Sequence, residues 1–247
     1  KQQAHMSSTN EVTILLIGPS KSGKSSLATR LKDDTFDPFG DQPTKPRTLS
    51  FNFKLTNKLL PSQPDEIKLN IIDTTNKADV STMENYIEFA DAVMFTHEYY
   101  SNANVWSDMM LKWCAKIQSV KCRQVVHTKV HADYIPFALV CTKFGDAVQN
   151  RVPSNGRIVE KKDAKLLEMF MIDNKQCIWD TTKYSLGSLY FQCSSETGEN
   201  VHAPFNHLIN QVFDQRREMN ALIQSQKKSS NPSRQLLNMV TSKSDMD

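Results

Sequence analysis

The sequence predicts an α/β fold in which helices flank a six-stranded, mostly parallel sheet. Short aliphatic runs alternate with helical patterns along most of the chain, as in proteins built from strand–helix–strand units. The first run, from Val12 to Ile17, is aliphatic and β-branched, which suits a strand covered on both faces. With 247 residues, 39% of them hydrophobic, the chain is long enough to bury the core of one such domain.

Six strands are expected where short apolar runs lie between polar or turn-forming segments. They are 12–17, 51–55, 68–72, 92–95, 137–141 and 189–192. The second and third strands are joined without a helix, so they can form an antiparallel edge pair. Helices are expected at 24–31, 83–90, 104–120, 163–172 and 201–217, with apolar residues near helical spacing in the longer ones.

One domain is expected, from residue 11 to residue 223. Residues 1–10 form a flexible N-terminus, in which Lys1–Met6 look like a cloning remnant. Two stretches, near 119–134 and 150–187, have too few core-forming residues to stand as domains and are interpreted as insertions. Residues 224–247 are polar and are expected to form a disordered tail.

Composition argues against several classes of protein. The formal net charge of +3 is too small to indicate nucleic-acid binding, and no basic run is interleaved with aromatic residues. The five cysteines form no Cys-x-x-Cys pair and are interpreted as buried, reduced thiols. Neither an apolar run of about 18 residues nor an apolar signal segment is found. A cytoplasmic protein is therefore expected.

A phosphate-binding motif follows the first strand. Gly18-Pro19-Ser20-Lys21-Ser22-Gly23-Lys24-Ser25 matches the P-loop pattern of nucleoside triphosphatases and lies between a strand and a helix, where that pattern has its meaning. The main-chain N–H groups from Lys21 to Ser26 can point at phosphate oxygens, assisted by the positive N-terminal end of the helix. The Lys24 ammonium would contact the β- and γ-phosphates, and the Ser25 hydroxyl would bind Mg²⁺.

Four later stretches resemble the Ras and Rab small GTPases. They are Thr48-Leu49-Ser50-Phe51, Ile71-Ile72-Asp73-Thr74-Thr75-Asn76-Lys77, Val140-Cys141-Thr142-Lys143-Phe144-Gly145-Asp146 and Ser194-Ser195-Glu196-Thr197-Gly198-Glu199-Asn200-Val201. The resemblance implies a Ras-like G domain that binds GTP or GDP with Mg²⁺, and a fold in which a P-loop, a six-stranded mostly parallel sheet and flanking helices are combined.

Roles for the magnesium and phosphate contacts follow from that resemblance. Thr48 corresponds to the threonine that enters the second strand, coordinates Mg²⁺ and senses the γ-phosphate, with Thr44 as an alternative for the same role. Asp73 ends its strand and is placed to hold a Mg²⁺-bound water. Asn76 stands where the family has the glycine whose N–H meets the γ-phosphate.

The guanine base would be bound by the last two stretches. Thr142, Lys143 and Asp146 face the family's Asn/Thr-Lys-x-Asp motif, but the carboxylate is one residue late. Aligning Asp146 instead would place Phe144 at the lysine position. Ser194, Ser195 and Glu196 resemble the Rab Ser-Ala-Lys segment, whose backbone N–H meets the guanine oxygen. Because the acceptor pair is altered, selectivity for guanine over adenine stays open.

Lys77 stands where the family has the glutamine that orients the attacking water. A lysine ammonium has no acceptor for a hydrogen bond from that water, so very slow or absent intrinsic hydrolysis is expected. The last cysteine is Cys193, so no C-terminal prenylation box is present and no lipid anchor is expected.

The combination is most similar to the small Rab-like subunit of the intraflagellar transport IFT-B complex, through Gly18-Pro19 at the start of the P-loop. That resemblance implies a nucleotide-stabilised docking subunit in a cilium or flagellum, bound to coiled-coil subunits of the IFT-B core. Two alternatives are an active switch GTPase of vesicle traffic recruited without lipidation and a P-loop small-molecule kinase. A kinase usually has an arginine-rich lid, whereas 150–187 contains only Arg151 and Arg157.

Overall fold

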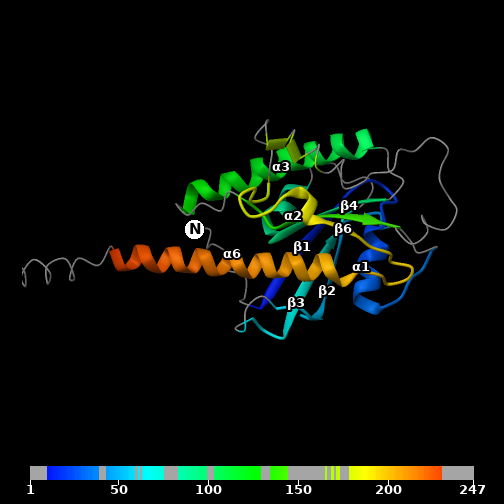
Figure 1. Cartoon of the computed structure of the whole chain (residues 1–247), viewed down its shortest axis with the longest axis horizontal. Coiled ribbons are helices and arrows are strands. Elements are labelled where there is room, and N and C mark those ends of the chain that lie inside the picture. The colour runs from blue at the N-terminus through cyan, green and yellow to red at the C-terminus, as the bar shows by residue number, and fades with distance from the viewer. Residues whose placement is uncertain are drawn as a thin grey trace, which may run out of the picture.

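The structure is a computed structural model, and it describes residues 10–38, 43–58, 61, 63–74, 83–98, 103–128, 134–143, 165, 168–169, 171–172 and 178–229. A six-stranded sheet lies at its centre, with strand order β2-β3-β1-β4-β5-β6. The strands are β1 Glu11–Ile17, β2 Arg47–Lys54, β3 Glu66–Asp73, β4 Ala92–Glu98, β5 Phe137–Thr142 and β6 Tyr190–Gln192. Only β2 runs antiparallel to its neighbour, β3, at one edge of the sheet. The predicted α/β fold is confirmed (Figure 1).

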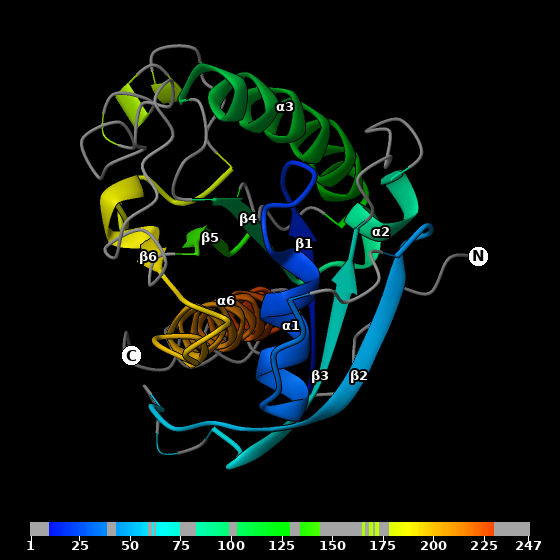
Figure 2. The ribbon, with the colours of Figure 1, turned by 90° about the vertical axis from the view of Figure 1, so that its right-hand side faces the viewer.

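Helices cover both faces of the sheet. They are α1 Lys24–Asp33, α2 Glu84–Phe89, α3 Ala103–Thr128 and α6 His202–Ser229, with a short 3-10 helix, η2, at Leu186–Leu189. Figure 2 shows the sheet between α3 on one side and α1 with α6, seen end-on, on the other. None of the helices in the described ranges is both long and apolar enough to cross a bilayer.

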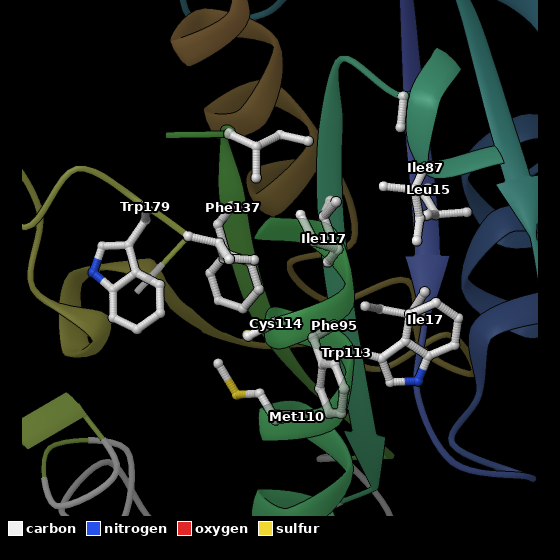
Figure 3. Packing of buried hydrophobic residues seen from close by; sticks show 14 of the residues in the cluster. Leu15, Ile17, Ile87, Phe95, Met110, Trp113, Cys114, Ile117, Phe137 and Trp179 are labelled. Atoms are coloured by element: carbon white, nitrogen blue, oxygen red, sulfur yellow. The ribbon is translucent and has the colours of Figure 1, made fainter. Parts of the chain in front are cut away.

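The core divides into two layers because neighbouring side chains of a strand point to opposite faces. Along β1, Leu15 and Ile17 pack toward α2 and α3, whereas Ile14 and Leu16 pack toward α1 and α6. Figure 3 shows the α3 layer, in which Trp113 and Ile117 meet side chains of the sheet. The central strands are thus buried on both faces, as the aliphatic sequence of β1 predicts.

Two helices, α3 and α6, extend beyond the sequence-based expectation. Helix α3 runs to Thr128, so residues 119–128 continue that helix. Ile117 and Val120 extend its buried face, and no glycine or proline lies between residues 103 and 128. Residues 129–133 and most of 144–177 lie outside the described residues. Of the expected helix 163–172, the five described residues, at 165, 168–169 and 171–172, are helical.

Helix α6 runs to Ser229, so the predicted disordered tail begins with helix. The six residues 224–229 contain neither glycine nor proline, and Pro232 comes only after them, so nothing local ends the helix earlier. At 28 residues, α6 is about 42 Å long and extends past the sheet (Figure 1). Residues 230–247 lie outside the described residues.

The three cysteines whose burial the structure describes agree with the prediction of buried, reduced thiols. Cys114, Cys141 and Cys193 are buried thiols that form no disulfide within the described part of the chain. Burial raises the pKa of the Cys141 thiol and of the Cys193 thiol to about 12, so both stay protonated near neutral pH. Cys177 lies outside the described residues.

Candidate functional site

The largest group of predicted site residues meets in a pocket of about 450 Å³ at the carboxyl ends of the parallel strands. In open α/β sheets, this edge carries the ligand site where the connections diverge from a central strand. Here β1 lies between β3 and β4, and the loop after β1 forms the pocket floor. The lining residues are Lys21, Ser22, Gly23, Lys24, Ser25, Ser26, Phe36, Asp37, Pro38, Pro43, Thr74, Thr142, Lys143, Ser194, Ser195 and Glu196.

The loop between β1 and α1 is fixed against β4. Gly18 adopts a φ of +152°, and a Cβ at this position would lie 2.1 Å from the carbonyl oxygen of Thr96. The Ser22 hydroxyl is 2.7 Å from the Thr96 hydroxyl. Gly23, at φ +78°, caps α1. Since α1 begins at Lys24, the N-terminal end of the helix faces the pocket, which is the arrangement that favours a bound phosphate.

The Lys24 ammonium folds back over this loop. Its Nζ donates hydrogen bonds to the carbonyl oxygens of Gly18, at 3.0 Å, and of Pro19, at 2.8 Å. Burial lowers the pKa of Lys24 to about 8, although the Asp73 carboxylate acts in the opposite direction. The cation is therefore held at the pocket floor by main-chain oxygens, from which it can turn to a phosphate.

Asp73 is the last residue of β3 and lies behind the pocket. Its side chain is fully buried, and Arg47 Nε donates to its Oδ2 at 3.2 Å. Its Oδ1 accepts no hydrogen bond from the part of the chain that the structure describes. Thr74, the next residue, lines the pocket and donates from its hydroxyl to the carbonyl oxygen of Leu16 at 2.8 Å.

The donor set fits magnesium. Mg²⁺ prefers oxygen ligands and is usually held by one or two protein groups together with phosphates and waters. The Ser25 hydroxyl lines the pocket, and Asp73 offers a buried oxygen that has no other partner among the described residues. Accordingly, no group of three or more His, Cys, Asp or Glu side chains that could bind a metal occurs within the described ranges.

Thr48 does not line the pocket. It is exposed within β2, opposite Ile72 of β3. Pro43 does line the pocket, and Thr44 follows it directly. Thr44 is thus nearer in sequence to the pocket wall, but neither threonine lines the pocket, and the choice between them for the contact with Mg²⁺ stays a prediction.

The other end of the pocket is built by the ends of β5 and β6. The Thr142 hydroxyl donates to the carbonyl oxygen of Ser22 at 2.7 Å, which joins β5 to the phosphate loop. Lys143 has a φ of +58°, and its ammonium forms an ion pair with Glu98 at 2.8 Å. These contacts bring the predicted base-binding residues next to the predicted phosphate-binding loop.

The segment after β6 forms a closed turn. Ser194 N donates to the carbonyl oxygen of Glu199 at 3.0 Å, and Gly198 N donates to that of Ser194 at 2.9 Å. Ser194 and Ser195 are buried, whereas Glu196 is exposed at the rim. The turn thus faces the pocket from the side of the expected base, as the resemblance to the Rab segment predicts.

The structure brings together all predicted residues of the phosphate loop, both described residues of the altered base motif and the three residues after β6. Asn76, Lys77 and Asp146 lie outside the described residues, and their roles stay predictions. Sequence reasoning missed Phe36, Asp37 and Pro38. The available signal was an aromatic residue, Phe36, three positions after the end of α1.

A second pocket, of about 250 Å³, lies between α6 and the segment 178–184. It contains Trp179, Tyr184 and Met219 but none of the predicted phosphate- or base-binding residues. The chemistry of nucleotide binding therefore belongs to the larger pocket.

Comparison with protein families agrees with this site. Residues 13–131 match the family model described as Ras of Complex, Roc, domain of DAPkinase. The matched segment includes the phosphate loop and Asp73 and ends after α3 and before β5. No curated protein matches the chain.

Proposed function

We propose that this protein, a GTP-binding member of the Ras superfamily with a Ras-like G domain, keeps its nucleotide with very slow or absent hydrolysis and uses it to stabilise a docking surface. The observation that carries the nucleotide-binding part is the single pocket that joins the phosphate loop, Thr142–Lys143 and the turn 194–196. Slow hydrolysis is supported by Lys77, at the position of the water-orienting glutamine.

A docking role is consistent with a nucleotide that is bound and hydrolysed very slowly or not at all. Nucleotide can order the segments around Thr48 and Asn76, and a partner that binds the ordered state better would shift the equilibrium by that difference in affinity. By resemblance, the partner would be a coiled-coil subunit of an IFT-B core in a cilium or flagellum. Glycine-proline at the start of the phosphate loop supports this subfamily.

Two measurements test the proposal. Mass spectrometry of the purified protein, before and after EDTA, should find GDP or GTP, and competition between GTP and ATP should favour GTP. Protein that stays empty in excess GTP, GDP and ATP would remove the nucleotide-binding claim. A preference for ATP would show that the altered motif at Thr142–Asp146 no longer selects guanine.

Hydrolysis gives the first specific prediction. Single-turnover GTP hydrolysis should be slower than about 10⁻⁴ s⁻¹, below the intrinsic rate typical of Ras-type GTPases. Lys77→Gln should raise it by about tenfold or more, because the amide can both accept from and donate to the attacking water. Lys54→Gln, the same charge change on β2, should leave the rate unchanged.

Ordinary small-GTPase turnover by the unmodified protein would contradict this prediction. It would favour the alternative of an active switch GTPase, which also requires that partner binding be lost on hydrolysis. Partner capture should therefore be compared between the GDP-loaded protein and protein loaded with a non-hydrolysable GTP analogue.

A further inference from the structure

The Asp73 carboxylate, which is expected to hold a Mg²⁺-bound water, forms an ion pair with an arginine side chain. Arg47, the first residue of β2, lies directly opposite Asp73, the last residue of β3, in the antiparallel register. The Arg47 Nε is 3.2 Å from Asp73 Oδ2. The strand register thus places a guanidinium on the carboxylate that precedes Thr74, a residue that lines the pocket.

The two partners differ in their access to water. The Asp73 side chain is fully buried, whereas 40% of the Arg47 side chain is exposed. Asp73 is also close enough to the Lys24 ammonium to affect its pKa. The negative charge of Asp73 is therefore balanced by Arg47 and Lys24. Of these two, the partly exposed Arg47 side chain can move toward solvent.

A divalent cation and the guanidinium compete for Asp73. Both are attracted by the same carboxylate, and they repel each other across the short distances of one pocket. A buried carboxylate left without a cation is costly, and Arg47 meets that need when Mg²⁺ is absent. Mg²⁺ bound through the unpartnered Oδ1 would share the carboxylate with the guanidinium on Oδ2, so its binding includes the cost of their repulsion or of moving Arg47 away.

We propose that Arg47 is a resident counter-ion of the magnesium site, which weakens Mg²⁺ binding and lets the protein keep its nucleotide when Mg²⁺ is removed. Arg47 acts through Asp73 and is a positioning residue that does not contact the nucleotide. The inference rests on the proposed nucleotide binding and adds to it how the cation is regulated.

The test uses the full chain loaded with a fluorescent GDP analogue. Fluorescence is followed while Mg²⁺ is titrated, and release of the analogue is timed with and without EDTA. Arg47→Gln removes the charge, and Lys45→Gln makes the same change two residues away at an exposed position. Arg47→Lys keeps the charge but loses the planar donor group.

Arg47→Gln should lower the dissociation constant of Mg²⁺ about tenfold, as expected when a competing charge is removed. EDTA should accelerate release from the unmodified protein by less than about tenfold and from Arg47→Gln by about a hundredfold, because the variant has lost its substitute cation. Lys45→Gln should behave like the unmodified protein, and Arg47→Lys should lie between it and Arg47→Gln.

Equal Mg²⁺ affinity for Arg47→Gln and the unmodified protein would overturn the proposal, as would an equal change for Lys45→Gln. If Arg47→Gln fails to fold, Arg47→Lys decides, since an unchanged Mg²⁺ response in that variant also contradicts it. Tight analogue binding with an unchanged Mg²⁺ response refutes the Arg47 role alone. Failure of every variant to bind the analogue refutes nucleotide binding, and with it this role.

Discussion

Gly18 of the phosphate loop is packed so closely against β4 that no side chain fits there. A Cβ there would lie 2.1 Å from the carbonyl oxygen of Thr96 and 2.6 Å from its hydroxyl. The carbonyl belongs to β4 and cannot move without disturbing the sheet. Gly198 offers a contrast, because its Cβ would lie 2.7 Å from the Arg30 Nη2, which is the end of a flexible side chain.

Gly18→Ala should therefore destabilise the protein without nucleotide by about 3 kcal/mol or more, through overpacking and backbone strain. For a chain of this size that corresponds to a fall in Tm of roughly 6–12 °C. Gly198→Ala, at φ +81°, should cost only about 1–2 kcal/mol, from its left-handed backbone. Thermal unfolding followed by circular dichroism measures both. Equal shifts would mean that contact with β4 does not limit position 18.

Lys24 should make nucleotide binding depend on pH. In the free protein its pKa is lowered to about 8 by burial. A bound polyphosphate should raise that pKa, so binding above pH 8 must take up a proton. Affinity for GDP should be flat from about pH 7 to 8 and then fall by up to about tenfold per pH unit.

Calorimetric titrations at several pH values, each in buffers of different ionisation enthalpy, measure both the affinity and the protons taken up. Lys24→Met should bind GDP weakly and lose the fall above pH 8. Affinity that declines equally steeply in this variant would assign the pH dependence to another group.

Among the elements, the segment 178–189 packs against the sheet through an aromatic pair and through the buried side chains of Leu186 and Leu189. The rings of Trp179 and Phe137 stack with centroids 5.4 Å apart, and Trp179 is 1% exposed (Figure 3). The main chain adds a hydrogen bond from Ile135 N to the carbonyl oxygen of Ile178 at 2.7 Å. The Trp179 indole N–H, by contrast, has no acceptor in the described part of the chain.

Trp179→Ala should lower the free energy of unfolding by about 3–5 kcal/mol, because a large buried ring is replaced by a cavity. Trp179→Phe keeps the aromatic packing and removes an N–H that makes no described bond, so it should cost less than about 1.5 kcal/mol. Urea unfolding measures the difference. Similar losses for the two variants would mean that the indole nitrogen contributes to stability.

The existence of the main elements could be predicted because each depends on local patterns. The strand, glycine turn and helix from Val12 to Leu31 carry their signals within a few residues of one another. Helix ends carried weaker signals, since α3 and α6 contain no breaker where apolar spacing fades, and both are longer than predicted. The start of β2, at Arg47 where residue 51 was predicted, has a related cause, because it depends on pairing with β3, which local sequence does not reveal.

Across the whole molecule, the site depends on contacts between distant parts of the chain. The ion pair between Arg47 and Asp73 appears only when β2 and β3 align, and the contact of Thr142 with Ser22 joins residues 120 positions apart. Motif matching identified Ser22, Asp73 and Thr142 as site residues. It could not show that Arg47 faces Asp73. Pairing register, rather than composition, determines that neighbourhood.

Helix α2 is fastened to α3 at both ends. Lys116 pairs with Glu84, and the Lys121 ammonium donates to the carbonyl oxygens of Glu88, at 3.0 Å, and Ala90, at 2.7 Å. Directly after β3, the Thr74 hydroxyl donates a hydrogen bond to the carbonyl oxygen of Leu16 in β1. Moving α2 away from α3 would break the contacts of Lys116 and Lys121 together. A partner that displaced α2 would have to supply new acceptors for both ammonium groups, so α2 is best suited to being bound in the position that it already holds.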